Sequence, residues 1–520
     1  MGDATAAFDA SLVDKEGKLA KDTNWWGAFV IGLSGTLLVI TLVGFTTAAL
    51  GPFSIALYIV LTLAGVFLCY CLAELATSMP DKTGGLPAYA FETYKPWGKG
   101  ASTHLGGLSS WGYWLGWFAV APINVIIAAD YVISLLELPT GTVFDPFGPS
   151  IGGPTSSTRL LVASVLLLIM FVPCYLGIRL GARFATVLGI CSIVPLLLII
   201  VMPFFNLGET DFGYAFSFDF VASGGWTGIT FSFTLVMAWA FIYTWTVLAM
   251  EAAACYVAEC RDPVRDAKIA LTAEGLFGLF IYITLPIMVL AVVGPAILND
   301  LQDGLFLGDP ATLFVAYTEK LFGASTFWEW FVGIALIAAL LLSVLNAVMG
   351  CARGLWQNSR DGILPRFFGR VNRHGVPSTA MLFNLVCSFL LLLIGNPLDI
   401  YIFSNVGYLF ALSLALIGYW LYRTKQPDAT RPFKLGGWAA PVALVIGVIF
   451  LFVWAYGGYF AADYQVGADK RILFWIGLVL LALWFPLYWW REAENKRYGT
   501  TFYHRVSAET SAGSEVGTGS

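Results

Sequence analysis

Long uninterrupted stretches of apolar residues dominate the chain and predict helices that cross a membrane. Residues 23–71 contain no charged side chain, and about 20 apolar residues suffice to cross the hydrocarbon core of a bilayer. This stretch is therefore long enough for two helices. Comparable runs follow at residues 105–135, 160–178, 184–206, 226–257, 269–297, 327–356, 378–396, 399–422, 438–460 and 471–490. The pattern predicts an all-α integral membrane protein with twelve transmembrane helices.

Composition supports this interpretation and sets the domain boundaries. The 520 residues are 58% hydrophobic and only 12% charged, whereas soluble domains carry roughly a quarter charged residues. A transmembrane β-barrel would show shorter segments of alternating polarity. We expect one membrane domain at 23–490, a cytoplasmic N-terminal tail at 1–22 and a disordered cytoplasmic tail at 491–520.

Basic residues gather in alternate loops and predict the orientation. The loops at 137–145, 209–219 and 299–309 are acidic or neutral, and the loops between them are basic. Because cytoplasmic loops are enriched in Lys and Arg, we expect both termini on the cytoplasmic side of the plasma membrane. The basic residues of these loops are Lys82, Lys95, Lys99, Arg179, Arg183, Arg261, Arg265, Lys268, Arg360, Arg366, Arg370 and Arg373, and the loop after the run at 399–422 adds Arg423, Lys425, Arg431 and Lys434.

Small and polar residues interrupt two of the apolar runs. The first run contains Ser34, Gly35 and Thr36, which suit either close helix packing or a broken helix whose freed backbone groups bind a substrate at mid-membrane. The sixth run contains Tyr243, Thr244, Trp245 and Thr246, followed by Glu251. If the repeat unit is five helices, these two segments are equivalent, which favours the broken-helix interpretation.

Three local motifs resemble the amino acid-polyamine-organocation superfamily of permeases. They are Ala73-Glu74-Leu75-Ala76 running into Pro80 and Gly84-Gly85, then Ala258-Glu259 with Asp262-Pro263, and Ser343 to Ala347 followed by Ser359 to Pro365. The resemblance implies a LeuT-type 5+5 inverted repeat, with repeats at about 25–206 and 226–422 and helices 11–12 at about 438–490. It also implies alternating access around a central site.

The resemblance implies a substrate site at the two interrupted helices and a secondary transporter for a small amino acid or amine. In many amino acid permeases a Gly-Ser-Gly-like run in helix one is followed by Ile-Phe, whereas here Thr36-Leu37-Leu38 follows Ser34-Gly35. This region also resembles ethanolamine-type amine permeases, so an amine is the alternative substrate. The expected substrate-binding residues are Ser34, Gly35, Thr36, Tyr243, Thr244, Trp245 and Thr246.

Four polar residues within the apolar runs are candidates for coupling or gating. Glu251 anchors a gate, titrates in proton coupling, or simply ends a helix near the headgroups. Asp130 lies toward the end of its run and is either a gate residue or an interfacial one, and Ser343 and Asn346 are gate or packing residues. We expect coupling to H⁺ or Na⁺, or exchange. Some members of the superfamily place a cation that substitutes for sodium in the fifth helix, but the run at 184–206 contains no lysine.

Aromatic residues allow two interpretations. Tyr243 and Trp245 suit a pocket for an organic cation, and Trp111 and Trp114 suit an interfacial belt.

Apart from membrane lipid, the expected partners are the substrate and the coupling ion. Cys and His lack metal-ligand spacing and no nucleophile motif is present, so we expect no catalytic residues, no metal, no cofactor and no nucleic acid. A non-transporting membrane sensor is the remote alternative.

Overall fold

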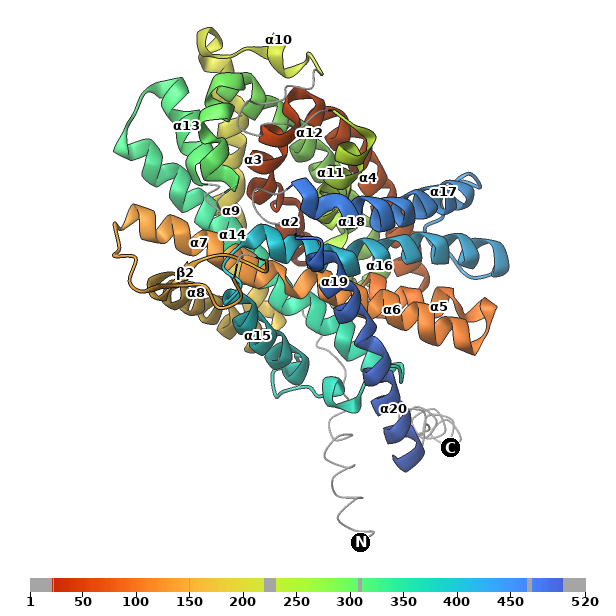
Figure 1. Cartoon of the computed structure of the whole chain (residues 1–520). Coiled ribbons are helices and arrows are strands. Elements are labelled where there is room, and N and C mark those ends of the chain that lie inside the picture. The colour runs from red at the N-terminus through yellow and green to blue at the C-terminus, as the bar shows by residue number, and fades with distance from the viewer. Residues whose placement is uncertain are drawn as a thin grey trace, which may run out of the picture.

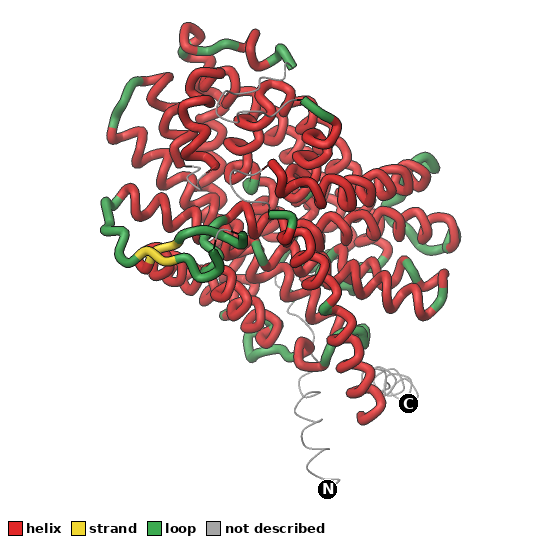
Figure 2. The backbone as a smooth tube through the Cα atoms, in the orientation of Figure 1, coloured by secondary structure: helices red, strands yellow, loops and turns green. Residues whose placement is uncertain are grey.

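Helices make up most of the computed structural model, and the residues it describes include one short pair of strands (Figure 2). The structure describes residues 21, 23–148, 150–218, 231–306, 311–464 and 470–498. The tails expected at 1–22 and 491–520 fall outside this part of the chain, apart from Lys21 and residues 491–498. Those last residues continue a helix that ends at Tyr498.

Within the described residues, ten segments are long and apolar enough to cross a membrane. The first of them, Trp25–Ser78, has 54 residues, which is more than two crossings of about 20 residues require. A further apolar helix, α15 (Ser378–Leu392), is shorter. The all-α membrane architecture is therefore confirmed, and the count of twelve stays a prediction.

The first half of the chain forms helices that run back and forth between two faces of the molecule (Figure 1). Its elements are α2 (Trp25–Thr36), α3 (Val39–Leu50), η1 (Gly51–Phe53), α4 (Ser54–Ser78), α5 (Leu86–Thr93), η2 (Lys95–Trp97), α6 (Lys99–Phe118), α7 (Val120–Leu135), β1 (Val143–Phe144), β2 (Thr155–Ser156), α8 (Ser157–Tyr175), α9 (Ile178–Val201), η3 (Met202–Phe205), η4 (Leu207–Glu209) and α10 (Phe212–Ala215). The strands pair antiparallel, with Val143 opposite Ser156.

The second half continues the same pattern. Its elements are α11 (Phe233–Val247), η5 (Ala249–Cys255), η6 (Val257–Glu259), α12 (Pro263–Phe306), α13 (Ala311–Phe322), α14 (Thr326–Arg360), η7 (Arg366–Gly369), α15, α16 (Pro397–Lys425), α17 (Ala439–Phe452), η8 (Val453–Gly457), α18 (Gly458–Phe460), η9 (Ala461–Tyr464), α19 (Ile472–Ala482) and α20 (Trp484–Tyr498). Gly294 kinks α12 because its φ of 69° is not helical.

Two of the departures from regular helix lie in helices one and six, and they define the functional centre. Helix one consists of α2 and α3, separated at Leu37 and Leu38. Helix six consists of α11 followed by the 3-10 helices η5 and η6. The regular helix extends through Thr36 and Val247, so both interruptions begin slightly later in the chain than the sequence pattern suggested.

The interrupted helices lie in the most enclosed part of the molecule. They pack against α6, α14 and α16, and the apolar windows of α14 and α16 are 83% and 89% buried. In contrast, the segments 439–464 and 472–498 are only 33% and 28% buried. Many of the large side chains that these outer helices expose are apolar, among them Val445, Trp475 and Val479, as expected for helices that face lipid. We call the face where Thr23 and Tyr498 lie the terminal face.

Candidate functional site

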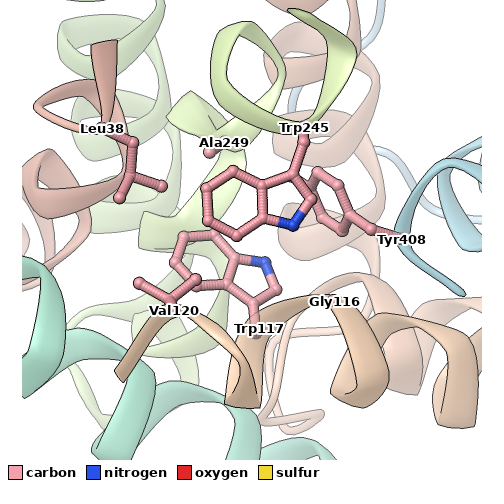
Figure 3. A pocket seen from close by; sticks show the side chains of 7 residues that line it. All are labelled: Leu38, Gly116, Trp117, Val120, Trp245, Ala249 and Tyr408. Carbon is pink, nitrogen blue, oxygen red and sulfur yellow. The ribbon is translucent and has the colours of Figure 1, made fainter. Parts of the chain in front are cut away.

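A narrow pocket lies where the interruptions of helices one and six meet α6 and α16 (Figure 3). In this closed arrangement the space between its side chains is too small for a water molecule. Leu38 comes from the interruption in helix one, and Trp245 and Ala249 lie on either side of the transition in helix six. Gly116, Trp117, Val120 and Tyr408 complete the lining. The indole rings of Trp117 and Trp245 lie next to each other across the pocket (Figure 3). The pocket is therefore built at both interruptions.

The interruption of helix one leaves backbone oxygens that other helices must satisfy. The Leu38 amide donates to the Gly35 carbonyl instead of the Ser34 carbonyl. The Ser343 hydroxyl donates to the Ser34 carbonyl across 2.9 Å. Because buried carbonyls without a partner are costly, this bond from α14 supports the interruption. Ser34 and Ser343, both expected at the site, are thus in direct contact.

One tyrosine connects the two interrupted helices. The hydroxyl of Tyr282, on α12, lies 3.1 Å from the Gly35 carbonyl and 2.7 Å from the Thr246 carbonyl. The helices also touch directly, since a Cβ added to Gly35 would lie only 2.1 Å from the Ala249 carbonyl oxygen. Glycine is therefore required at position 35 for helix one to close on helix six.

Glu251 is the hub of a buried hydrogen-bond cluster beside the pocket. Its Oε1 accepts from the Tyr113 hydroxyl at 3.0 Å, the Tyr408 hydroxyl at 3.1 Å and the Trp117 indole N–H at 3.2 Å. The residue is fully buried, and the described residues give it no ion pair. The cluster joins helix six to α6 and α16 through a carboxylate that has three donors. Of the three interpretations of Glu251, this geometry favours the gate anchor over a helix end among headgroups.

Further polar contacts continue from this cluster toward the terminal face. The Tyr256 hydroxyl donates to the side chain of Asn346. The next layer is the ion pair of Glu259 and Arg353, in which both side chains are essentially buried. Each pair joins helix six to α14. These layers close the route between the pocket and the terminal face.

A last layer at the terminal face joins the loop after α4 to the end of α14. Lys82 forms ion pairs with Asp361 at 2.6 Å and Glu92 at 3.0 Å. Burial alone would raise the pKa of Glu92, but Lys82 and Lys95 outweigh burial and hold this pKa below its ordinary value. Glu92 therefore stays ionised and keeps its attraction for Lys82 down to acidic pH.

The pocket is also closed on the side away from the terminal face. The hydroxyls of Thr41 and Tyr401 form a hydrogen bond between helix one and α16. The Tyr401 ring meets the Trp245 ring edge-on, with 4.3 Å between centroids. The structure therefore holds the pocket closed on both sides.

The remaining predicted residues lie at different distances from the pocket. Trp245 lines the pocket, whereas the Tyr243 ring packs on Tyr58, with 4.7 Å between centroids. The Thr244 hydroxyl donates to the Phe241 carbonyl. Asp130 lies apart from this cluster, in an ion pair of 2.5 Å with Arg159. Their roles in binding or coupling stay predictions.

The belt interpretation of Trp111 and Trp114 is wrong. The two residues are only 3% and 5% exposed. Their indole N–H groups donate inside the protein, to the Leu480 carbonyl and the Asn384 side chain. Interfacial tryptophans present their rings to the headgroups, whereas these two join α6 to α19 and α15.

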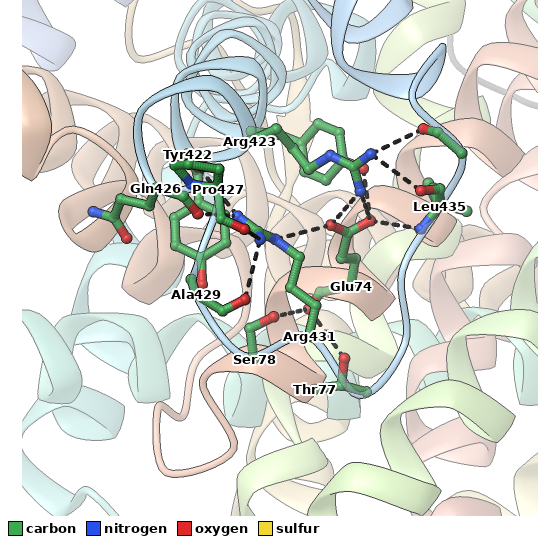
Figure 4. A network of polar contacts seen from close by, with 12 residues as sticks. Glu74, Thr77, Ser78, Tyr422, Arg423, Gln426, Pro427, Ala429, Arg431 and Leu435 are labelled. Carbon is green, nitrogen blue, oxygen red and sulfur yellow. Dashed lines mark hydrogen bonds and ion pairs between the residues drawn. The ribbon is translucent and has the colours of Figure 1, made fainter.

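Glu74 forms a separate network at the terminal face, where α4 ends (Figure 4). The carboxylate pairs with Arg423 at 2.7 Å and Arg431 at 3.3 Å. It also accepts from the Tyr419 hydroxyl and the Leu435 amide. These contacts fasten α4 to the end of α16 and the following loop, which supports a structural role for Glu74.

Sequence reasoning missed several residues of the site. The sequence pattern assigned no role to Trp117, Tyr113, Tyr408 or Tyr282. The one available signal was the i, i+4 spacing of Tyr113 and Trp117, which places both rings on one face of α6. Their partner Glu251 lies 134 residues further along the chain than Trp117.

Comparison with known proteins identifies the family. The sequence profile described as amino acid permease matches residues 24–482. The chain is 24% identical to a large neutral amino acids transporter small subunit 2 of Mus musculus, over 80% of this chain and 70% of that protein. It is 27% identical to an arginine/ornithine antiporter of Latilactobacillus sakei, over 75% and 72% of the two chains. It is also 25% identical to a branched-chain amino acid permease of Bacillus subtilis, over 82% and 86%.

The match covers both interrupted helices, the Glu251 cluster and the layers toward the terminal face. These names belong to transporters and not to enzymes. The chain therefore belongs to the amino acid permease family and is a multi-pass membrane protein.

Proposed function

We propose that this protein is a secondary transporter that moves a small amino acid across the plasma membrane by alternating access. The observation that carries the proposal is the closed pocket at the two interrupted helices, lined by Leu38, Trp245 and Ala249. Interrupted helices at mid-membrane expose backbone groups that bind the carboxylate and ammonium of an amino acid.

The substrate's two charged ends would meet different parts of the site. When the pocket opens, the Ser34 hydroxyl, which has no hydrogen-bond partner among the described residues, is an available donor for a carboxylate. The rings of Trp117, Trp245 and Tyr408 offer faces for an ammonium group or an apolar side chain. An amine would use only the second part of this site, so the amino acid is the preferred substrate.

Alternating access follows from the layered contacts on each side of the pocket. The Glu251 cluster, the Glu259–Arg353 pair and the Lys82–Asp361 pair would separate when the pocket opens to the terminal face, which the charge pattern assigns to the cytoplasm. The contacts of Tyr401 with Thr41 and Trp245 would separate when it opens to the other side. Opening one set while the other stays closed carries the substrate across.

The test is uptake by purified protein in liposomes. A panel of labelled amino acids and amines is offered with and without an imposed proton or sodium gradient, with protein-free liposomes as control. We expect uptake of at least one amino acid above the control. Uptake restricted to amines would replace the substrate class, and no uptake across the panel would contradict transport.

A further inference from the structure

A second buried carboxylate, Glu274, lies at the contact between the two interrupted helices and has no role in the site described above. It is fully buried on α12. Its Oε2 accepts a 3.3 Å hydrogen bond from the Ala253 amide in η5. Its Oε1 has no hydrogen-bond partner among the described residues, which also give it no ion pair.

The carboxyl group occupies a space that helix one leaves open. A Cβ added to Gly32 would lie 2.1 Å from Glu274 Oε1 and 2.6 Å from the Ala253 nitrogen. Glu274 is therefore enclosed by α2 on one side and η5 on the other. This enclosure exists only while helix one is packed against helix six.

Among the described residues, no positively charged side chain interacts with Glu274. α2, from Trp25 to Thr36, carries no ionisable side chain. The ionisable groups close enough to interact with Glu274 are Glu251 on η5, Cys69 on α4 and Tyr282 on its own helix. Two neighbouring carboxylates without a cation cannot both be ionised cheaply in a membrane interior.

The hydrogen bonds decide which of the two carboxylates holds the proton. Glu251 has three side-chain donors, and donors stabilise the ionised form. Glu274 has one long bond from an amide, so its neutral form fits this closed site. An amide donor repels a sodium ion, and the described surroundings do not supply the several oxygen ligands that a metal cation requires.

We propose that Glu274 is the proton-binding site of the transport cycle, with its protonation linked to the closing of helix one on helix six. When the two helices are packed, the carboxyl group is enclosed and keeps its proton. When helix one moves away, water reaches the group and the proton can leave. The O–H bond breaks and the proton passes to water, so no other reactant is needed.

The first experiment measures protonation and helix packing without transport. Infrared spectroscopy of the purified protein should show the carbonyl band of a neutral carboxylic acid at neutral pH. This band should disappear in Glu274→Gln and persist in Glu251→Gln. Loss of the band only in Glu251→Gln, or no such band in the wild type, would overturn the assignment.

Hydrogen exchange of residues 25–36 tests the link to closure. After correction for intrinsic exchange, protection of this segment in the wild type should decrease as the pH rises. Glu274→Gln should stay protected at every pH, whereas the exposed control Glu209→Gln should behave as the wild type. If Glu274→Gln follows the wild-type pH dependence, the link is contradicted. Should Glu274→Gln fail to fold, Glu274→Asp should keep a pH dependence with a shifted midpoint.

Transport adds the last test, and it rests on the proposed function. A gradient of one pH unit can drive up to about tenfold accumulation of a neutral substrate that enters with one proton. Glu274→Gln should lose this accumulation and keep exchange of internal for external substrate. Proton-driven accumulation that survives in Glu274→Gln would overturn the inference. Absence of all transport in the wild type would contradict the proposed function, while the infrared and exchange results would still decide the protonation of Glu274.

Discussion

Single glycines set how closely the interrupted helices approach. Gly32 and Gly35 lie one helical turn apart on α2, and each faces the backbone of η5. A methyl group at either position would meet atoms that cannot move without displacing helix six. Packing of this kind leaves no room for even one added carbon. The two glycines therefore make the closed form of the pocket possible.

We expect Gly35→Ala to prevent closure, because the new Cβ would lie 2.1 Å from the Ala249 carbonyl oxygen. Substrate exchange in liposomes should fall at least tenfold. The matched control is Gly189→Ala on α9, where the nearest atom would be 3.4 Å away, at ordinary contact distance. Equal activity of the two variants would show that this approach is not needed for transport.

Glu251→Gln should slow transport at every pH without changing the shape of the pH profile. A glutamine amide oxygen accepts more weakly than a carboxylate, and hydrogen bonds to charged groups are worth about 1.5–3 kcal/mol. We therefore expect a loss of about tenfold or more in the uptake rate. A flattened pH profile would instead make Glu251 the proton carrier, which is one of the three interpretations that the sequence allowed.

Trp245→Ala should weaken substrate binding more than Tyr243→Ala, because Trp245 lines the pocket whereas the Tyr243 ring packs on Tyr58. An aromatic contact to an ammonium group is worth about 0.5–2 kcal/mol, so the apparent Kd should rise about two- to thirtyfold. Titration of the purified protein with the transported amino acid measures the difference. Equal losses would place both rings at the substrate.

At the level of elements, helix six is held to the rest of the bundle by successive polar layers. Glu251 joins it to α6 and α16, while Tyr256 and Glu259 join it to α14. Under the proposed alternating access, each layer would connect a segment that moves to one that forms its surroundings. The layers differ in kind, from a charge-assisted cluster to a buried ion pair.

The buried ion pair gives a prediction that concerns the packing of helix six on α14. Arg353→Met should destabilise the protein by about 3–5 kcal/mol, because Glu259 would be left as a buried charge without its partner. Thermal unfolding in detergent micelles measures the loss. The double variant Arg353→Met, Glu259→Leu should recover much of the stability, since two apolar side chains replace the pair. A double variant no more stable than Arg353→Met alone would contradict this account.

The elements themselves were largely predictable from the sequence, for physical reasons. Charge-free length predicts a membrane span because a bilayer interior excludes unpaired charge. The small residues Ser34 and Gly35 marked the interruption of helix one to within three residues of Leu37. The contacts between distant helices were not predictable, because Trp117, Tyr282 and Tyr408 become partners of helices one and six only through packing. The same limit explains Trp111, whose type suggested a membrane interface although its ring is buried in the protein.

At the scale of the whole molecule, a single site is enclosed by contacts on two sides. Helices α14 and α16 are largely buried and surround the interrupted helices, while segments 439–464 and 472–498 form a lipid-facing exterior. Such an arrangement suits movement of one group of helices against another around a fixed site. The central claim is that an amino acid crosses the membrane through the pocket at the two interruptions.

Counterflow in liposomes tests this claim most directly. Liposomes that contain purified protein are loaded with an unlabelled amino acid, and entry of the same labelled amino acid is followed without any ion gradient. The account predicts rapid entry with the wild type and Gly189→Ala, and entry reduced at least tenfold with Gly35→Ala. Entry with Gly35→Ala at the wild-type rate, or no entry of any amino acid with the wild type, would contradict it.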